Sequence, residues 1–326
     1  RADGTLVGLP FALFPAVTFY NRGLFDEAGL NYPPQEFGAP YVWEDGTEVP
    51  WNYDTAREIA MILTVDGMGY DATMDEFDPA NIVQFGLNFQ WAGQRLQWTD
   101  LQPEIWYDAE TNTIDIPESW YTANQWLQDA VWTDHFMPSE TYNASELFGA
   151  GNVFQTGNLG MAIVPTWYTC CLGEAIGKFE FDFAVVPQSF DGEYHVAMDM
   201  DTFRLVDGAD NLEEAFTVLT YLVGEATSSL APVYGAFPSL EQYQQPWMDA
   251  KEDQYQMGAN WQVIVDSLAY ANPVSMHHES ATPNYQKGTD RVAAFGTLLY
   301  SDAGADIDVA AELDAMAADL QAIVEE

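Results

Sequence analysis

The segment GLPFALFPAVTFYNRGLFDEAGL, residues 8–30, gives the clearest indication of how this chain folds. Its first part holds short apolar runs separated by Pro10 and Pro15, a pattern that predicts a strand, a turn and a second strand. The β-branched and aromatic residues at 17–20 are typical of a buried strand. A helix is expected from Gly23, with Gly29 as its C-terminal cap.

Outward from this segment, stretches with strand character alternate with stretches with helix character. Asn52 is suited to cap a helix over 53–64, because its side chain can accept a hydrogen bond from a free backbone N–H. Further helices are expected over 116–132, 211–226, 256–270 and 306–324. Strands are expected over 82–91, 158–164, 181–186 and 194–206. The alternation predicts the α/β class, and 326 residues favour two domains over one.

The charge balance excludes several classes of function. The chain has 51 acidic and only 9 basic residues, a formal net charge of −42. Nucleic-acid binding needs a basic footprint, so we expect no nucleic-acid partner. Docking on an anionic membrane and binding of a multiply anionic ligand are disfavoured for the same reason.

The familiar catalytic and cofactor motifs are absent from the sequence, so no cofactor, metal or catalytic residue is predicted. There is no phosphate-binding loop, dinucleotide fingerprint, HExxH or GxSxG. The acidic stretch 66–79 lacks the ligand spacing of a calcium loop. Cys170 and Cys171 are adjacent, and neighbouring cysteines rarely form an unstrained disulfide, so no disulfide framework is expected. The opening Arg-Ala-Asp-Gly has no apolar leader, and we expect the numbering to begin inside a longer precursor.

Aromatic residues are the informative excess, with 11 Trp, 17 Tyr and 19 Phe. Most should belong to the core, but flat rings also stack on the CH faces of sugars while carboxylates and amides bind the hydroxyl groups. In α/β proteins, loops at strand ends face the ligand. This criterion selects Phe14, Trp91, Trp167, Tyr168 and Phe237.

Several segments in order resemble the extracellular solute-binding proteins of ABC importers, in the maltose-binding-like, carbohydrate-binding group. Besides 8–30, they are PWNYDTAREIAMILTVDGMG (50–69), FDPANIVQFGL (77–87), LFGAGNVFQTGNLGMAIVPTWY (147–168), FDFAVVPQ (181–188) and DAGADIDVAAELDAMAADLQAIV (302–324). The resemblance implies a two-lobe periplasmic-binding-protein-like fold of the α/β class with hinge crossovers.

The resemblance also implies how the chain divides between the lobes. Lobe 1 would hold residues 1–17 and 190–272, and lobe 2 would hold 18–189 and 273–326. The family has several βα units before the segment that matches 8–30, so the first lobe is expected to be incomplete at its N-terminal side. The implied crossovers lie near Val17–Phe19, Pro187–Phe190 and Asn272–Met276.

Residue by residue, Trp167 falls where the family commonly places a stacking aromatic, and Trp91 falls where it places ligand-contacting residues. Phe14 stands at a position that is often polar in maltose binders, which argues against maltose itself. Asp199 and Asp201 would accept from sugar hydroxyls, or would face a cation or amine.

Two further positions complete the implied binding site. Phe237 lies in a turn at the rim of the site. Tyr285, with Phe295 as the alternative, would replace a second stacking tryptophan of the maltose binders.

The expected function is a receptor without catalysis, which binds a neutral sugar or oligosaccharide between its lobes and delivers it to the permease subunits of an ABC transporter. A monomer in the periplasm or outside the cell is expected, with or without a lipid anchor. The alternatives are a secreted glycoside hydrolase with an Asp/Glu pair, a receptor for a polyamine or glycerophosphodiester, and a surface carbohydrate-binding module.

Overall fold

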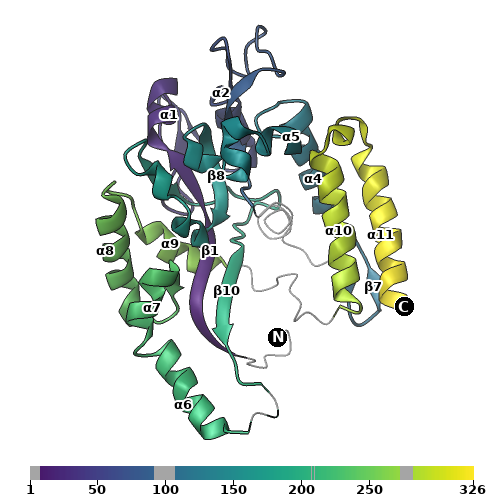
Figure 1. Ribbon diagram of the computed structural model, residues 1–326. Helices are drawn as coiled ribbons and strands as arrows, with labels where there is room; N and C mark the ends of the chain where they lie inside the picture. Colours follow the sequence, from purple (N-terminus) through teal and green to yellow (C-terminus); the bar gives the residue numbers. More distant parts are fainter. Residues whose placement is uncertain (1–7, 92–106, 207, 209, 272–281) are drawn as a thin grey trace.

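The computed structural model describes residues 8–91, 107–206, 208, 210–271 and 282–326 (Figure 1). Its strands are β1 Leu9–Asn21, β2 Tyr41–Val42, β3 Glu48–Val49, β4 Val65–Asp66, β5 Ile82–Asn88, β6 Tyr107–Asp108, β7 Thr113–Ile114, β8 Leu159–Pro165, β9 Phe181–Ala184, β10 Met198–Phe203 and β11 Phe237–Pro238. Its α-helices are α1 Arg22–Ala28, α2 Tyr53–Ile62, α4 Glu118–Trp132, α5 Glu140–Asn143, α6 Leu212–Val223, α7 Thr227–Tyr234, α8 Gln244–Tyr255, α9 Gln262–Ser267, α10 Tyr285–Tyr300 and α11 Val309–Glu325. Short 3-10 helices connect them, among them η2 Glu146–Gly151 and η4 Thr166–Cys170.

Strand β1 is the spine of a seven-stranded sheet with the order β10-β1-β8-β5-β4, in which β9 and β11 also pair with β1. Up to Pro15, β1 runs antiparallel to β10. From Ala16 onward it pairs with β8 and β9 instead. One strand therefore passes from the lower half of the molecule, with α6 to α9, to the upper half, with α1 and α2 (Figure 1).

The predicted turn inside this segment is wrong, because Leu9–Asn21 is one continuous strand. Pro10 lies at a register irregularity between β1 and β10. Pro15 is the last β1 residue paired with β10, directly before the pairing with β8 begins. A proline has no N–H to donate and is tolerated where a ladder is irregular or ends. The two prolines therefore mark changes of pairing and not a chain reversal.

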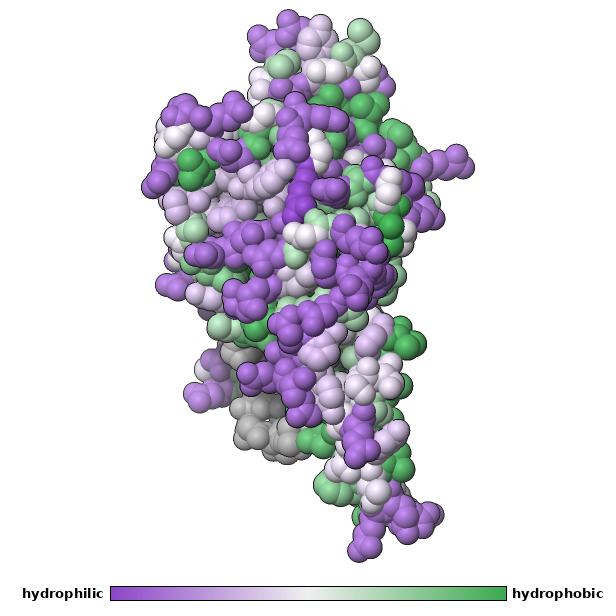
Figure 2. Space-filling view, turned by 90° about the vertical axis from the view of Figure 1, so that its left-hand side faces the viewer, coloured by the Kyte–Doolittle hydropathy of each residue, from purple (hydrophilic) through white to green (hydrophobic). Residues whose placement is uncertain are grey.

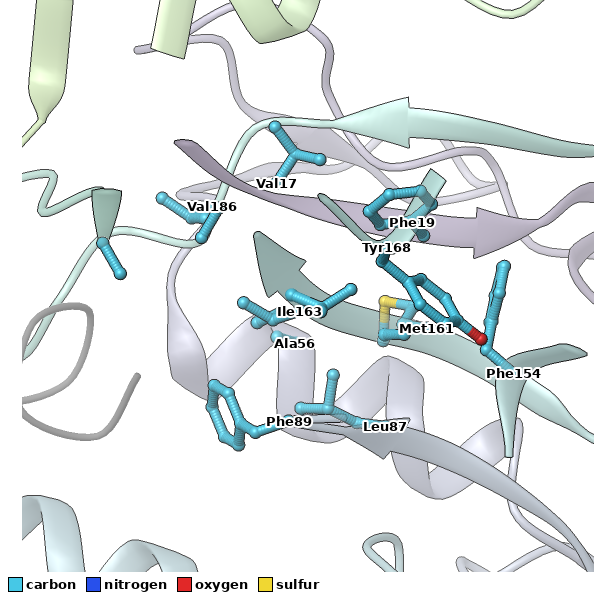
Figure 3. Close-up of a cluster of buried hydrophobic side chains, with 14 of the residues drawn as sticks. Val17, Phe19, Ala56, Leu87, Phe89, Phe154, Met161, Ile163, Tyr168 and Val186 are labelled. Atoms are coloured by element: carbon cyan, nitrogen blue, oxygen red, sulfur yellow. The ribbon is translucent and has the colours of Figure 1, made fainter. Parts of the chain in front are cut away.

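The main core lies between the second half of β1, strands β5 and β8, and helix α2. Figure 3 shows Val17, Phe19, Leu87, Met161 and Ile163 gathered there, and all five are fully buried. Burial of this apolar surface is the main force that holds the strands and the helix together.

Capping residues end or begin α1 and α2, and two of them, Gly29 and Asn52, were predicted from the sequence. The side chain of Asn21 accepts from Gly23 N at the start of α1, and Gly29 ends that helix in the left-handed region with a φ of 68°. Asn52 accepts from Thr55 N at 2.9 Å and begins α2, as predicted. Caps of this kind satisfy backbone N–H groups that the helix itself leaves free.

The structure also differs from the sequence expectations in the last third of the chain. The helix expected over 256–270 is shorter, since α9 spans Gln262–Ser267. The strand pair expected over 194–206 is the single strand β10. Helices α7, α8 and α10 were not predicted. A proline inside α7, at Pro232, weakens the helical pattern there.

The surface is mainly hydrophilic on the face shown in Figure 2, with apolar patches between the polar residues. Helix α6 is an exception to the usual burial of large apolar side chains. Phe216, Val218 and Tyr221 are 55–56% exposed, and Val233 on α7 is 90% exposed. Large apolar side chains are more often buried than exposed in this way. Within the described residues, no helix is long and apolar enough to span a membrane.

Candidate ligand-binding site

Two tryptophans from different strand ends lie against each other. Trp91 follows β5, and Trp167 lies in η4 directly after β8. Strands β5 and β8 are parallel neighbours, so their carboxyl ends meet at the same edge of the sheet. The two ring planes are 12° apart and their centroids are separated by 6.3 Å. Trp91 is 49% exposed, so this pair presents an aromatic face to solvent.

Trp91 also has an unusual backbone, with a φ of 56°. A bulky residue in the left-handed region is strained, and such strain persists where the surroundings fix the conformation. Here Tyr168 meets the Trp91 ring edge-on, at a centroid distance of 5.5 Å and an angle of 90°. Contacts with both neighbouring rings therefore hold Trp91 in this conformation.

A hydrogen bond joins this aromatic pair to the lower half of the sheet. The indole Nε1 of Trp167 donates to Asp199 Oδ2 at 2.9 Å. Asp199 lies on β10, opposite Phe14 of β1 in the antiparallel register. Trp91, Trp167 and Asp199, predicted from distant parts of the sequence, are therefore brought together by the fold.

The second predicted carboxylate, Asp201, lies two residues further along β10. Its Oδ2 accepts from the hydroxyl of Tyr234 at 2.7 Å, and this hydrogen bond raises the pKa of the Tyr234 phenol. The ring of Tyr234 is 57% exposed and contacts Phe14 with its centroid 6.5 Å away. Phe14 itself is only 4% exposed, so it supports the surface from below.

Tyr234 was not predicted from the sequence. The turn that contains it was singled out, but Phe237 was chosen as its ligand contact. Gly235 ends α7 with a φ of 76°, and the close of that helix presents Tyr234 towards Asp201. No sequence signal pointed to Tyr234, because the helix that ends at Gly235 was not predicted.

Beneath the two tryptophans lies a hydrogen-bonded polar layer. The Tyr168 hydroxyl donates to Asn152 Oδ1 at 2.6 Å, and Gln90 Nε2 donates to the same oxygen at 3.0 Å. Gln90 also accepts from Phe154 N at 2.8 Å. Burial raises the pKa of Tyr168, which therefore stays a neutral donor. Asn152 and Gln90 have no sequence motif that could have pointed to them.

Three of the predicted ligand-binding residues do not lie on the surface formed by Trp91 and Trp167. Tyr168 and Phe237 are fully buried, and Phe237 packs edge-on against Trp247 at a centroid distance of 5.3 Å. In this structure both support the site from inside and present no surface to a ligand. Tyr285 is the first residue of α10, a helix that packs against α11 and α4. The set that the fold brings together is Phe14, Trp91, Trp167, Tyr168, Asp199 and Asp201.

The local geometry describes two further sequence features, the adjacent cysteines and the acidic stretch 66–79. Cys170 and Cys171 are joined by a disulfide, so the expectation that the adjacent pair stays unbonded is wrong. In the acidic stretch 66–79, Asp66 accepts from the backbone N–H groups of Met68, Tyr70 and Asp78 at 2.8–3.0 Å. Its carboxylate therefore organises the loop through backbone hydrogen bonds.

Two hollows elsewhere on the upper half are rival locations for a ligand, with volumes of about 460 and about 430 Å³. Both are lined by Arg22. The Arg22 guanidinium donates to Asp182 Oδ2 at 2.6 Å and to Met257 O at 2.7 Å, and Tyr20 donates to the same carboxylate. These polar groups already satisfy one another. We therefore favour the aromatic pair, in which Trp91 is 49% exposed, as the candidate site.

Comparison with solved structures assigns the fold. The chain is similar to UspC of M. tuberculosis, with 18% identity, a TM-score of 0.72 and coverage of 97% of this chain and 75% of that one. It is also similar to the ABC substrate-binding protein Lmo0181 from Listeria monocytogenes in complex with cycloalternan, with 17% identity, a TM-score of 0.69 and coverage of 99% and 72%. A third match is the maltose/maltodextrin-binding domain MalE from Bdellovibrio bacteriovorus bound to maltotriose, with 17% identity, a TM-score of 0.65 and coverage of 99% and 73%.

No protein-family model matches the chain, and no curated protein matches it. At 17–18% identity the three solved structures show the fold and do not identify a ligand for this chain. The chain has the mixed α/β fold of the periplasmic binding proteins, as expected from the sequence. It spans 72–75% of the length of these relatives.

Proposed function

We propose that the chain is the solute-binding receptor of an ABC importer and that it binds a neutral sugar or oligosaccharide on the surface formed by Trp91, Trp167 and Asp199. The single observation that carries this proposal is the near-parallel pair of tryptophans, in which Trp91 is exposed and Trp167 donates to a carboxylate of the other half of the molecule. The rings supply apolar area for the CH faces of a sugar. The carboxylates supply direction by accepting from its hydroxyl groups.

In this proposal the two halves of the molecule are the two lobes, with lobe 1 comprising residues 1–17 and 190–272 and lobe 2 comprising 18–189 and 273–326. The first crossover is supported by β1, which changes partners between Pro15 and Ala16. The crossover expected near Asn272–Met276 lies outside the described residues. Trp167 belongs to lobe 2 and Asp199 to lobe 1, so a ligand on this surface would contact both lobes.

Contact with both lobes is what a hinged receptor needs. A ligand shifts an open–closed equilibrium only by its difference in affinity for the two states. A sugar stacked on Trp167 and hydrogen-bonded to Asp199 makes its full set of contacts only when the lobes are closed. The closed form would then be presented to the permease, and the protein is expected to act as a monomer in the periplasm or outside the cell.

The charges at the site favour an uncharged solute over an anionic one. Asp199 and Asp201 lie on the same strand, two residues apart, and the chain as a whole carries a formal net charge of −42. Both carboxylates would repel a phosphodiester at short range. They would attract a polyamine, which is therefore the competitor that an experiment must separate from a sugar. Solved relatives bound to cycloalternan and to maltotriose support the choice of a saccharide.

Isothermal titration calorimetry against a panel of solutes tests the proposal. The panel holds neutral oligosaccharides, spermidine and a glycerophosphodiester, and each ligand is recovered afterwards and examined by mass spectrometry. We expect saturable heat from a neutral saccharide that is recovered intact. Saturable heat from spermidine alone contradicts the sugar assignment and keeps the receptor. Cleavage of a glycoside that a single Asp or Glu substitution abolishes contradicts the receptor and supports a hydrolase.

A further inference from the structure

The disulfide between Cys170 and Cys171 lies in the same short turn as Trp167. Helix η4 comprises Thr166–Cys170, and the disulfide closes a small ring through the peptide bond at its end. Cys170 is exposed and Cys171 is half-buried. Cross-linking adjacent residues removes backbone freedom from the turn that carries the tryptophan.

The turn is also bonded on both sides. Cys171 N donates to Tyr168 O at 2.8 Å, and Asn152 Nδ2 donates to Cys171 O at 3.3 Å. Asn152 is the residue that accepts from the Tyr168 hydroxyl, so the disulfide belongs to the polar layer beneath the tryptophans. The backbone of Cys171 thus connects the cross-link to the support of the aromatic pair.

The other side of the turn contacts the lower half of the molecule. The Tyr255 hydroxyl donates to Thr169 O at 2.5 Å, and the Thr169 hydroxyl donates to Gly235 O at 3.5 Å. A side chain at Gly235 would place its Cβ 3.3 Å from Cys170 Cβ. Gly235 directly follows Tyr234, the partner of Asp201. The cross-linked turn is therefore connected to both carboxylates of the site. It contains Trp167, which donates to Asp199, and it contacts Gly235, the neighbour of the residue that donates to Asp201.

We propose that the Cys170–Cys171 disulfide positions Trp167: it fixes the η4 turn so that the indole N–H reaches Asp199 and the ring lies parallel to Trp91. Neither cysteine contacts the ligand in this proposal, so both are positioning residues. An aromatic side chain that is already ordered loses less freedom when a ligand stacks on it. The effect on affinity rests on the proposed sugar-binding function, whereas the effect on ring placement does not.

Fluorine NMR of protein labelled with 5-fluorotryptophan tests ring placement without any ligand. Resonances of Trp91, Trp167 and Trp43 are assigned with Trp→Phe variants, and Trp43 on the β2–β3 hairpin serves as the internal control. The disulfide is then reduced with a water-soluble phosphine. The phosphine takes an oxygen atom from water and becomes the phosphine oxide, while the two sulfurs take up two protons as thiols.

We expect reduction to shift or broaden the Trp167 and Trp91 lines and to leave Trp43 unchanged. The double variant Cys170→Ser, Cys171→Ser should resemble the reduced protein and should not respond to the phosphine. Unchanged Trp167 and Trp91 lines after complete reduction overturn the proposal. Two free thiols in the untreated protein, counted by alkylation and mass spectrometry, also overturn it. Reduction of the wild-type protein keeps the test decisive should the double variant fail to fold.

The second readout is affinity for the saccharide found by calorimetry. We expect reduction to weaken binding about fivefold to tenfold, as ordering one aromatic side chain on binding would do. If reduction shifts the tryptophan lines but leaves Kd unchanged, the disulfide positions the rings but does not contribute to affinity, and the second part of the proposal is wrong. If no saccharide binds in either redox state, the proposed function is wrong. The NMR experiment then still tests whether the disulfide positions Trp167.

Discussion

Trp167 carries the largest share of the proposed recognition, because its ring and its N–H serve different purposes. In the proposed function the ring stacks on a sugar, and the N–H donates to Asp199 Oδ2 at 2.9 Å and so fixes the direction of that carboxylate. A carboxylate offers four lone-pair positions to hydrogen-bond donors. The proposed site therefore combines an apolar ring, Trp167, with a carboxylate, Asp199, whose orientation the ring's N–H fixes.

We predict that Trp167→Ala weakens saccharide binding by about 2 kcal/mol, roughly thirtyfold in Kd, since a stacked aromatic at the centre of a site is a typical hot spot. Stability should change little, because Trp167 is only half-buried. Calorimetry and thermal unfolding measure the two effects. Trp43→Ala, on the β2–β3 hairpin, is the matched control and should leave Kd unchanged. A Trp167→Ala protein that binds normally removes this residue from the site.

Trp91 and Trp167 were predicted from their places at strand ends, and Asp199 and Asp201 from the family resemblance. Phe237 could not be separated from them in this way. It lies in a strand-end turn as they do, but its ring turns inward onto Trp247. Gln90 and Asn152 escaped prediction because their role depends on a hydrogen bond between residues 62 positions apart. Long-range contacts of this kind have no local signature.

Elements meet where small residues permit it, and Gly86 in β5 is the clearest case. A Cβ at this position would lie 1.9 Å from the carbonyl oxygen of Ala60 and 2.4 Å from its Cα. Both contacts are with backbone atoms of α2, which cannot rotate away. Helix α2 therefore packs directly against β5 because residue 86 has no side chain.

We predict that Gly86→Ala lowers the free energy of unfolding by roughly 3 kcal/mol, as overpacking of a rigid core does. Urea denaturation measures the change. Gly173→Ala is the control, because nothing lies within 4 Å of its Cβ position, and its effect should stay within about 0.5 kcal/mol. Equal effects of the two substitutions would contradict the packing of α2 on β5.

The loop after β4 depends on the ionised form of Asp66. Burial alone would raise the pKa of this carboxyl, but hydrogen bonds from the backbone N–H groups of Asp78, Tyr70 and Met68 outweigh it and hold the pKa below its ordinary value. A carboxyl whose pKa is lower in the folded state stabilises the fold above its unfolded pKa of about 3.9. This contribution is lost as the pH falls through the folded pKa.

We predict that wild-type protein is more stable than Asp66→Asn at about pH 6, and that the difference shrinks as the pH falls below about 4. The midpoint of urea denaturation, measured for both proteins across this range, reports the difference directly. Comparison of the pair cancels the titration of the other carboxylates. A difference that stays constant with pH would show that the charge of Asp66 does not stabilise the loop.

Helix boundaries near good caps were predictable from sequence, whereas the course of β1 was not. Asn52 and Gly29 act through their immediate neighbours, and the ends of α1 and α2 fall where those residues predict. Pro10 and Pro15 were interpreted as a chain reversal because a local pattern does not reveal pairing partners. The structure places them where β1 changes its pairing. Local chemistry fixes caps, whereas sheet topology depends on distant strands.

At the scale of the whole molecule, the lower half exposes large apolar side chains on α6 and α7. Strand β10 is at the edge of the sheet order, and α6 exposes Phe216, Val218 and Tyr221 beside it in sequence. Roughly a quarter of each solved relative has no counterpart in this chain. The upper half, in contrast, contains the main core and the aromatic pair.

We predict that the double variant Phe216→Lys, Tyr221→Lys binds less of an apolar fluorescent dye than the wild type does and unfolds at nearly the same urea concentration. Both side chains are 55% exposed, so the substitutions remove apolar surface from solvent contact without opening a cavity. Leu219→Lys on the same helix is the control. That side chain is only 7% exposed, and its replacement should destabilise the protein. If the double variant binds as much dye as the wild type, the dye binds to an apolar surface other than that of α6.

The central claim is that one bound saccharide contacts both halves of the molecule at Trp91, Trp167 and Asp199. Fluorine NMR during a saccharide titration tests this claim most directly. In protein labelled with 5-fluorotryptophan, the lines of Trp91 and Trp167 should move together and saturate with the calorimetric Kd, while Trp43 stays fixed. Saturable saccharide binding that leaves Trp91 and Trp167 unmoved would contradict the account.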